Sequence, residues 1–252
     1  MTTVMTYLFL FLAGSVFGWV LELFFRKFFS SQNPEHKWIN PGFFTGPYVP
    51  LYGMGLCLLY ILANIQLDVG SPVLNVVLRF FEMAAAMTAL EFAVGLFTLK
   101  VTKVRLWDYS NSWGNVMGLI CPKFFLAWGA LGTAYVYFLH PHISIAAEWL
   151  TEHPFTSLFI GFFYGVFAVD VVYSLKILSK IKAFAKDHNI TVKYEELKTS
   201  IRRSSEERKE KIHYFLAFIS ELPITEHLKK YAAQTKSATI RIKEKLTHKN
   251  EK

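Results

Sequence analysis

The stretch Asn40–Gly55, NPGFFTGPYVPLYGMG, decides how the fold of this chain is to be interpreted. It holds three prolines and four glycines, residue types that interrupt helices and build turns. From residue 38 to residue 67, however, the chain carries no Asp, Glu, Lys or Arg. A turn-rich composition inside an uncharged run indicates irregular backbone at membrane depth, which is tolerated only where protein covers it or it lines a cavity. We expect irregular backbone over residues 40–50 and helix from residue 51 onward.

This uncharged run is one of several long apolar segments. The chain has 252 residues, of which 53% are hydrophobic, and a mean hydropathy of +0.30. A helix needs about 20 apolar residues to cross the hydrocarbon of a bilayer. Five stretches meet this length, so we expect an all-α integral membrane protein with about five transmembrane helices, at about residues 4–25, 43–65, 73–99, 116–139 and 155–178.

The charges are distributed unevenly along the chain. Residues 1–181 hold 10 basic and 9 acidic side chains, whereas residues 182–252 hold 17 and 10. Lys and Arg follow the first, third and fifth predicted spans, but not the second and fourth. Because basic loops stay in the cytoplasm, five spans place the N-terminus outside and the C-terminus inside. We expect a transmembrane domain, residues 1–181, and a basic helical cytoplasmic tail, residues 182–252, in a multi-pass protein of the bacterial cytoplasmic membrane.

The tail contains two apolar features. Residues 213–219 form a short apolar patch, and Ile224, Leu228 and Tyr231 follow at spacings of four and three residues. This spacing predicts an amphipathic helix that lies on the membrane face or against a partner. A solvated helix with a frayed end is the alternative.

Charged residues within the predicted spans are costly, and each needs an explanation. Glu22 precedes Arg26 by four residues, and Arg79 precedes Glu82 by three. Residues at these spacings are neighbours on a helix surface, so each couple can form a local ion pair.

Two other carboxylates lack such a local partner. Glu91 and Asp170 have no basic residue within four positions. Each must face the interior of the helix bundle, find a distant partner, or be protonated. They can serve as proton or cation relays, or only as structural hydrogen-bonding groups between helices.

A second unusual cluster, RLWDYSNSWGN, occupies Arg105–Asn115 between the third and fourth predicted spans. Its aromatic residues suit the aromatic belt at the headgroup level of a membrane. Interface anchoring does not explain why so many polar groups are mixed with them. By the predicted topology, this cluster and the Asn40–Gly55 stretch both lie on the cytoplasmic side.

The motifs GWVLEL, NPGFFTGPYVPLYGMG and EFAVGLF, followed by RLWDYSNSWGNVMGLICPKFFLAWG, resemble the bacterial putative ABC-transporter type IV family, also called CmpB-like permeases. The resemblance covers roughly residues 10–140 and leaves the basic tail outside. It implies a membrane transport component of unknown substrate that works with a separate ATPase. Together with Asp170, the candidate binding or transport site comprises the residues at the family's motif positions: Glu22, Asn40, Gly42, Gly46, Pro47, Tyr52, Gly53, Glu91, Trp107, Asp108, Tyr109, Ser110 and Asn115.

Several kinds of chemistry are missing from the sequence. It contains no Walker A, H-E-x-x-H, G-x-S-x-G or C-x-x-C pattern. We therefore predict no catalytic residue, no metal site, no cofactor and no nucleic-acid partner. The expected partners are the lipid bilayer and either a separate ATPase subunit or a second copy of the chain.

Three functions remain open at this point. The first is a transport component. The second is a membrane enzyme acting on a lipid at the inner leaflet, with Glu22, Glu91, Asp108 and Tyr109 as an acid–base set. The third is a non-catalytic regulator or scaffold that works through the basic tail.

Overall fold

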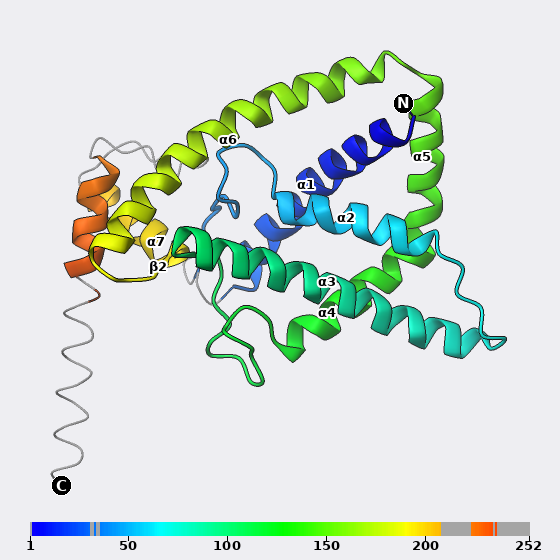
Figure 1. Cartoon of the computed structure of the whole chain (residues 1–252), viewed down its shortest axis with the longest axis horizontal. Coiled ribbons are helices and arrows are strands. Elements are labelled where there is room, and N and C mark those ends of the chain that lie inside the picture. Colours follow the sequence, from blue (N-terminus) through cyan, green and yellow to red (C-terminus); the bar gives the residue numbers. More distant parts are fainter. Residues whose placement is uncertain (1, 31–32, 34–35, 208–222, 234, 236–252) are drawn as a thin grey trace, which may run out of the picture.

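The computed structural model of the chain describes residues 2–30, 33, 36–207, 223–233 and 235. Helices dominate this part of the chain, as predicted (Figure 1). The helices are α1 (Thr2–Phe28), α2 (Pro50–Ala63), α3 (Pro72–Thr102), α4 (Pro122–Ala134), the π-helical turn η1 (Tyr135–Leu139), α5 (His140–Glu152), α6 (Thr156–Asp187) and α7 (Tyr194–Glu207). The all-α prediction did not include the two short strands β1 (Val104–Arg105) and β2 (Val192–Lys193), which pair in parallel.

Prolines mark where three of the helices begin. Pro50, Pro72 and Pro122 are the first residues of α2, α3 and α4. A proline suits this position because its φ is already helical and the N–H that it lacks would have no partner there. The prediction of irregular backbone before residue 50 and helix after it is confirmed.

The helix at the fourth predicted span begins and ends later in the chain than the residues predicted for that span. Residues 116–121 belong to a closed loop, in which Met117 and Gly118 have positive φ values of 56° and 68°. The chain then stays helical past residue 139, through η1 and α5 to Glu152, where a loop was expected. Pro141, which has no N–H to donate, lies in the first turn of α5, directly after the π-helical turn η1, and prolines and π-bulges are both places where a continuous helix kinks without ending.

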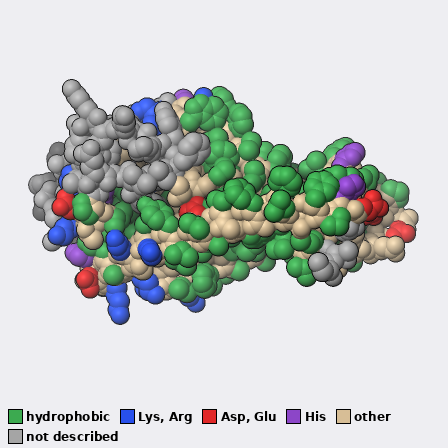
Figure 2. All heavy atoms as spheres, turned by 90° about the horizontal axis from the view of Figure 1, so that it is seen from above, with side chains coloured by type: hydrophobic (Ala, Val, Ile, Leu, Met, Phe, Trp, Pro, Cys, Tyr) green, Lys and Arg blue, Asp and Glu red, His purple; other side chains and the backbone are tan. Residues whose placement is uncertain are grey.

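Within the described residues, three helices are long and apolar enough to cross a membrane, namely Thr3–Phe28, Pro72–Thr102 and Thr156–Asp187. Figure 2 shows hydrophobic side chains covering the middle of one face, with Lys and Arg gathered at the end that holds α7. His and acidic side chains lie at the opposite end. An apolar middle between polar ends suits a bilayer and indicates a membrane location. The count of five spans and their orientation stay predictions.

Close approach of α2 to α1 requires a glycine at position 53. A Cβ atom there would lie 2.2 Å from Ser15 Oγ and 2.5 Å from the Phe11 carbonyl oxygen. Any larger residue would push the two helices apart. Gly53, one of the predicted site residues, is therefore a packing position between two helices.

The predicted pair Arg79–Glu82 on α3 is confirmed at 2.7 Å. Arg79 also donates to the carbonyl oxygens of Leu62, at 2.9 Å, and Ile65, at 2.8 Å. These carbonyls belong to the C-terminal end of α2 and the turn after it, where helical partners are missing. The arginine therefore joins α3 to the end of α2.

A separate hydrophobic core lies at the α7 end of the molecule and joins α6, β1, β2, α7 and the helical residues 224–233. Leu228 is fully buried in this core and Tyr231 is 4% exposed, with Ile224 packed against them. The predicted helix is confirmed, but its apolar face packs on the chain itself. The membrane-face and solvated-helix interpretations of that face are thus wrong. The apolar patch at residues 213–219 lies outside the described residues.

Candidate functional site

The irregular stretch before α2 is fastened to α6 by a single carboxylate. Asp170 accepts hydrogen bonds from the main-chain N–H groups of Thr45, at 3.2 Å, and Gly46, at 2.8 Å. It also accepts one from the Tyr48 hydroxyl, and Ser174 donates to it at 3.1 Å from the next turn of α6. Asp170 therefore has several close hydrogen-bond partners within the protein. Three of these four donors come from the loop, and Ser174 comes from α6 itself.

The two residues in the middle of this loop have different surroundings. A Cβ atom at Gly46 would lie 2.2 Å from Cε1 of Tyr48, whose hydroxyl donates a hydrogen bond to Asp170. Only glycine lets the main chain approach the ring so closely. Pro47, in contrast, is exposed and points out of the cluster, so the structure does not bring it together with the other predicted site residues.

Asn40 closes the loop from its other end. Its Oδ1 accepts hydrogen bonds from Trp19 Nε1, at 2.9 Å, and from the Gly42 N–H, at 3.1 Å. Its Nδ2 donates to the carbonyl oxygens of Phe44, at 3.1 Å, and Thr45, at 3.3 Å. One side chain thus ties the loop to itself and to α1, which explains why an amide is needed at this position.

Helix α7 donates to the same loop. Lys198 Nζ lies 2.5 Å from the carbonyl oxygen of Asn40, and the Tyr194 hydroxyl lies 2.9 Å from that of Gly42. Lys198 is buried, and burial lowers its pKa to about 8. The irregular loop before α2 is therefore held partly by the segment that was expected to be a separate tail.

A chain of charges, of which Lys198 is buried and the others are partly buried, connects α1 with α7. Arg26 pairs with Glu22 on its own helix at 3.0 Å, as predicted, and with Glu195 on α7 at 2.7 Å. Glu195 lies 3.8 Å from Lys198. Burial acts to raise the pKa of Glu195, but the neighbouring Lys198 and Arg26 outweigh it and lower the pKa. The ion pairs thus alternate in sign, which is the arrangement that buried charges require.

Glu91 is the most buried of the predicted acidic residues, with 4% of its surface exposed. Its two carboxylate oxygens accept hydrogen bonds from the Tyr109 hydroxyl, at 2.9 Å, and from Trp128 Nε1, at 3.0 Å. Glu91 therefore lies in the interior of the helix bundle and has distant hydrogen-bond partners, which are two of the alternatives expected for it. Tyr109 comes from the second motif loop, and Trp128 comes from α4.

Glu22 is connected to Glu91 through two aromatic side chains, Tyr52 and Trp128. The Tyr52 hydroxyl donates to Glu22 at 2.7 Å, and the Tyr52 ring meets the Trp128 ring edge-on with centroids 5.9 Å apart. Because Trp128 bonds Glu91, the carboxylates Glu22 and Glu91 belong to one continuous cluster. We call Glu22, Tyr52, Glu91, Tyr109 and Trp128 the carboxylate cluster.

Asp108 organises the second motif loop. It accepts hydrogen bonds from Arg105 and from the Ser110 N–H, both at 3.1 Å, and it pairs with Lys193 of β2 at 2.9 Å. Partial burial acts against ionisation, but the hydrogen bonds from Ser110 and Lys193 outweigh it and lower the pKa of Asp108 to about 2. Both of its carboxylate oxygens are thus engaged within the protein.

The other polar residues of this loop also serve its shape. Asn115 Nδ2 donates to the Ser110 carbonyl at 3.2 Å, and Asn115 Oδ1 accepts from the Gly118 N–H at 2.9 Å. Trp107 Nε1 donates to the Leu119 carbonyl at 2.8 Å. Of the second motif, only Tyr109 reaches the carboxylate cluster.

Sequence reasoning missed several residues that complete these sites. Trp19, Tyr48 and Trp128 each bond a predicted site residue. A buried Trp N–H or Tyr hydroxyl needs a partner, so their positions in apolar runs were a usable signal. The α7 contacts carried no such signal, because Tyr194, Glu195 and Lys198 lie in an unremarkable polar segment. Among the described residues, no group of three or more His, Cys, Asp or Glu could hold a metal ion.

A family model described as "Putative ABC-transporter type IV" matches residues 9–175. The chain belongs to this family. The match extends beyond the resemblance seen at residues 10–140, because it includes α5 and most of α6 with Asp170. It ends before β2 and α7, so the family model contains both motif loops but not the α7 residues that hold the first loop, nor Lys193 of β2, which pairs with the second. Searches of curated proteins and of solved structures found no match.

Proposed function

We propose that the chain is the membrane component of a transport system that works with a separate ATPase subunit in the bacterial cytoplasmic membrane. In this proposal the transmembrane domain, residues 1–181, crosses the membrane five times, with the N-terminus outside. The tail, residues 182–252, lies in the cytoplasm. Membership of the family described as "Putative ABC-transporter type IV" supports a transport role.

The carboxylate cluster is the observation that carries the proposal. It places Glu22 of α1 and Glu91 of α3 in one polar region inside apolar helices, connected through Tyr52 and Trp128. Ionisable groups at membrane depth are costly and mark the paths of ions or polar solutes. We propose that the cluster contacts the transported solute or a coupling cation.

The engagement of Asp108 favours transport over a lipid-modifying enzyme. A general acid or base must be within reach of the substrate proton. Both Asp108 oxygens already accept from Arg105, Ser110 or Lys193. The acid–base set of the enzyme hypothesis therefore loses one of its members.

The experiment is purification of the tagged full chain in mild detergent, followed by identification of any copurified ATPase and measurement of its ATP hydrolysis in liposomes. We expect Glu91→Gln to lower the hydrolysis at least tenfold without loss of the ATPase from the complex. Glu152→Gln, at the exposed end of α5, is the matched control and should leave the rate unchanged. Recovery of no ATPase, together with liposomes that move no solute, would refute the transport function.

A regulator or scaffold is the second candidate, and the α7 contacts favour it. Lys198 and Tyr194 bond the carbonyls of the first motif loop, so the tail can influence that loop directly. A double variant, Lys198→Met with Tyr194→Phe, removes both bonds while it retains most of the apolar contacts. The variant is expressed in a strain from which the gene has been deleted. Failure of the double variant to restore the lost phenotype supports a regulatory tail, whereas full restoration by a chain ending at residue 181 excludes it.

A further inference from the structure

The outer surface of α6 changes from apolar to basic within one turn. Leu175 is 56% exposed and is the last of the exposed large apolar side chains of this helix, and the next residue, Lys176, is exposed as well. The end of α3 changes in the same way, with Val101 43% exposed and Lys103 exposed after it. We call the exposed lysines of these two helix ends the lysine rim: Lys100, Lys103, Lys176, Lys180, Lys182 and Lys186.

The two helix ends lie side by side. β1 follows α3 directly, and its Val104 belongs to the same buried core as Ile177 and Ile181 of α6. Figure 1 shows the end of α3 next to the last turns of α6. On the face seen in Figure 2, hydrophobic side chains give way to Lys and Arg toward this end of the molecule. The lysine rim therefore lies at one level, where the apolar middle of the molecule ends.

We propose that the lysine rim binds the headgroups of anionic phospholipids at the place where α3 and α6 leave the bilayer. This requires only that the two helices cross a membrane, whatever the chain transports.

The lysines of the rim are free to take such a partner. Among the residues that the structure describes, no ion pair involves any of the six. Asp187 is the only acidic side chain in residues 171–187, which hold four of these lysines. Unpaired ammonium groups next to an apolar helix attract the negative surface of a bilayer and donate to phosphate oxygens.

The length of α6 before the rim matches a bilayer. From Thr156, where the helix begins, to Leu175 there are 20 residues, which span about 30 Å at the helical rise, the thickness of the hydrocarbon layer. Tyr173, which is 39% exposed, lies three residues before the first lysine of α6, and tyrosine is common at membrane interfaces. The lysines of α6 therefore begin at headgroup depth.

The lysines also continue the side of α6 that faces outward. Phe162, Val169 and Lys176 follow one another at intervals of seven residues, which is close to two helical turns and places them on one stripe. Phe162 is 74% exposed and Val169 is 72% exposed. Ile177 and Ile181 face the other way, into the buried core. Lys176 therefore meets the lipid around the helix rather than the interior of the protein.

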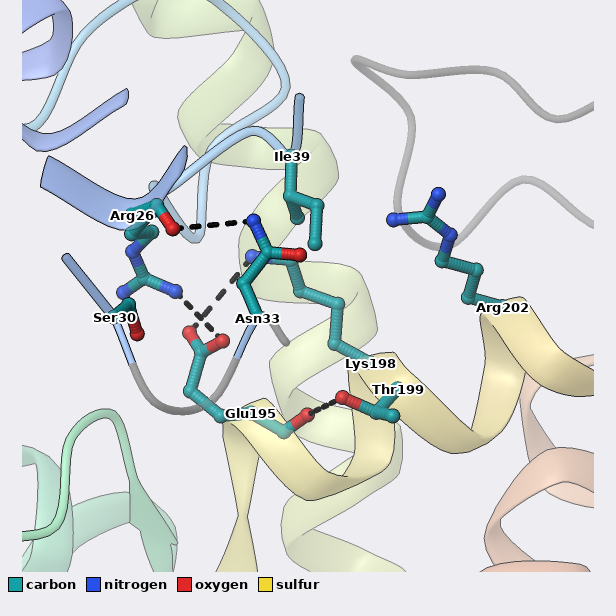
Figure 3. Close-up of a pocket in the computed structure, with 8 residues that line it drawn as sticks. All are labelled: Arg26, Ser30, Asn33, Ile39, Glu195, Lys198, Thr199 and Arg202. Carbon is teal, nitrogen blue, oxygen red and sulfur yellow. Dashed lines mark hydrogen bonds and ion pairs between the residues drawn. The ribbon is translucent and has the colours of Figure 1, made fainter. Parts of the chain in front are cut away.

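The basic side chains between α1 and α7 differ from the rim in this respect. Figure 3 shows Arg26 and Lys198 both reaching the carboxylate of Glu195, at 2.7 Å and 3.8 Å. Arg26 also pairs with Glu22. Because their charges are balanced within the protein, these side chains offer no free charge to a lipid.

The test measures lipid binding to the full chain in maltoside detergent by native mass spectrometry. Phosphatidylglycerol is titrated against phosphatidylcholine with the same acyl chains, since both carry a phosphate but only phosphatidylglycerol has a net charge. We expect the unmodified chain to prefer phosphatidylglycerol, and less so at high salt. The double variant Lys176→Gln with Lys180→Gln should bind phosphatidylglycerol about tenfold more weakly, because each lysine near an anionic surface adds to the attraction.

The matched control is Lys229→Gln with Lys230→Gln, which removes the same charge from two exposed lysines outside the rim. The control should bind phosphatidylglycerol like the unmodified chain. An equal loss in both double variants overturns the proposal, because overall charge would then explain the binding. If the first variant does not fold, Lys182→Gln with Lys186→Gln takes its place, and unchanged binding there contradicts a role of the rim.

Two further outcomes overturn the proposal. The first is equal binding of the two lipids by the unmodified chain. The second is full displacement of phosphatidylglycerol by an equal concentration of free glycerol 3-phosphate, which would make a soluble anion the ligand. None of these measurements involves an ATPase or solute movement, so a negative result leaves the proposed transport function untouched.

Discussion

The two motif loops at the α7 end hold their shape by different means. The loop at residues 40–48 depends on distant partners, because Asp170 lies 124 residues from Gly46 in sequence and Lys198 lies 158 from Asn40. The loop at residues 105–118 is closed mainly by its own side chains, with bonds that span 3 to 12 residues. The first loop can therefore form only after α6 and α7 have docked, whereas most of the second can form locally.

The largest effect is expected at the anchor of the first loop. Asp170→Ala leaves two main-chain N–H groups and the Tyr48 hydroxyl without their acceptor. Because unsatisfied buried donors are costly, we expect the free energy of unfolding to fall by about 3 kcal/mol. Hydrogen exchange at residues 44–48 and the thermal midpoint in detergent measure this loss. Asp187→Ala, at the exposed end of the same helix, is the control and should change neither.

The next effect concerns the contact between Gly46 and the Tyr48 ring. In Gly46→Ala the new Cβ lies 2.2 Å from the ring, which must move away from Asp170. We expect a loss of about 2 kcal/mol, typical of overpacking. Gly165→Ala adds the same methyl group where no atom lies within 4 Å, and should not destabilise the protein. Equal thermal midpoints for the two variants would contradict the tight first loop.

A smaller, pH-dependent effect is expected in the second loop. The pKa of Asp108 falls from its ordinary value of 3.8 to about 2 in the folded chain. A lowered carboxyl pKa contributes stability that is present above about pH 4 and lost as the pH falls toward 2. We expect Asp108→Asn to cost about 1.5 kcal/mol at neutral pH, and the difference from the unmodified chain to shrink toward pH 2. A difference that stays constant over this range would exclude the ionised carboxylate as its source.

The smallest effect is expected where the second loop meets the tail. Lys193 is 46% exposed at its side chain, and its pair with Asp108 is therefore screened by solvent. Lys193→Gln should lower the free energy of unfolding by about 0.5 kcal/mol, and less at high salt. A loss as large as that of Asp170→Ala, measured by the same thermal midpoint, would mean that the second loop depends on the tail as much as the first.

The outcome of the sequence predictions follows the same division between local and distant contacts. The pairs Glu22–Arg26 and Arg79–Glu82 were predicted because both partners lie within one turn of one helix. The partners of Glu91 could not be named, since Tyr109 and Trp128 lie 18 and 37 residues away. The position of the tail helix could not be predicted either, because its spacing only shows that one face is apolar and not what covers it.

The sequence by itself determined the apolar helices and the irregular stretch before Pro50. Each of these depends on the hydropathy or backbone chemistry of residues that are close together in the chain. Only the tertiary structure decided that Asp170 anchors the loop at residues 40–48, that Glu22 and Glu91 share one cluster, and that α7 reaches the first motif loop and β2 the second. These contacts join residues far apart in sequence, and local chemistry specifies that a buried polar group needs a partner but not which helix brings it.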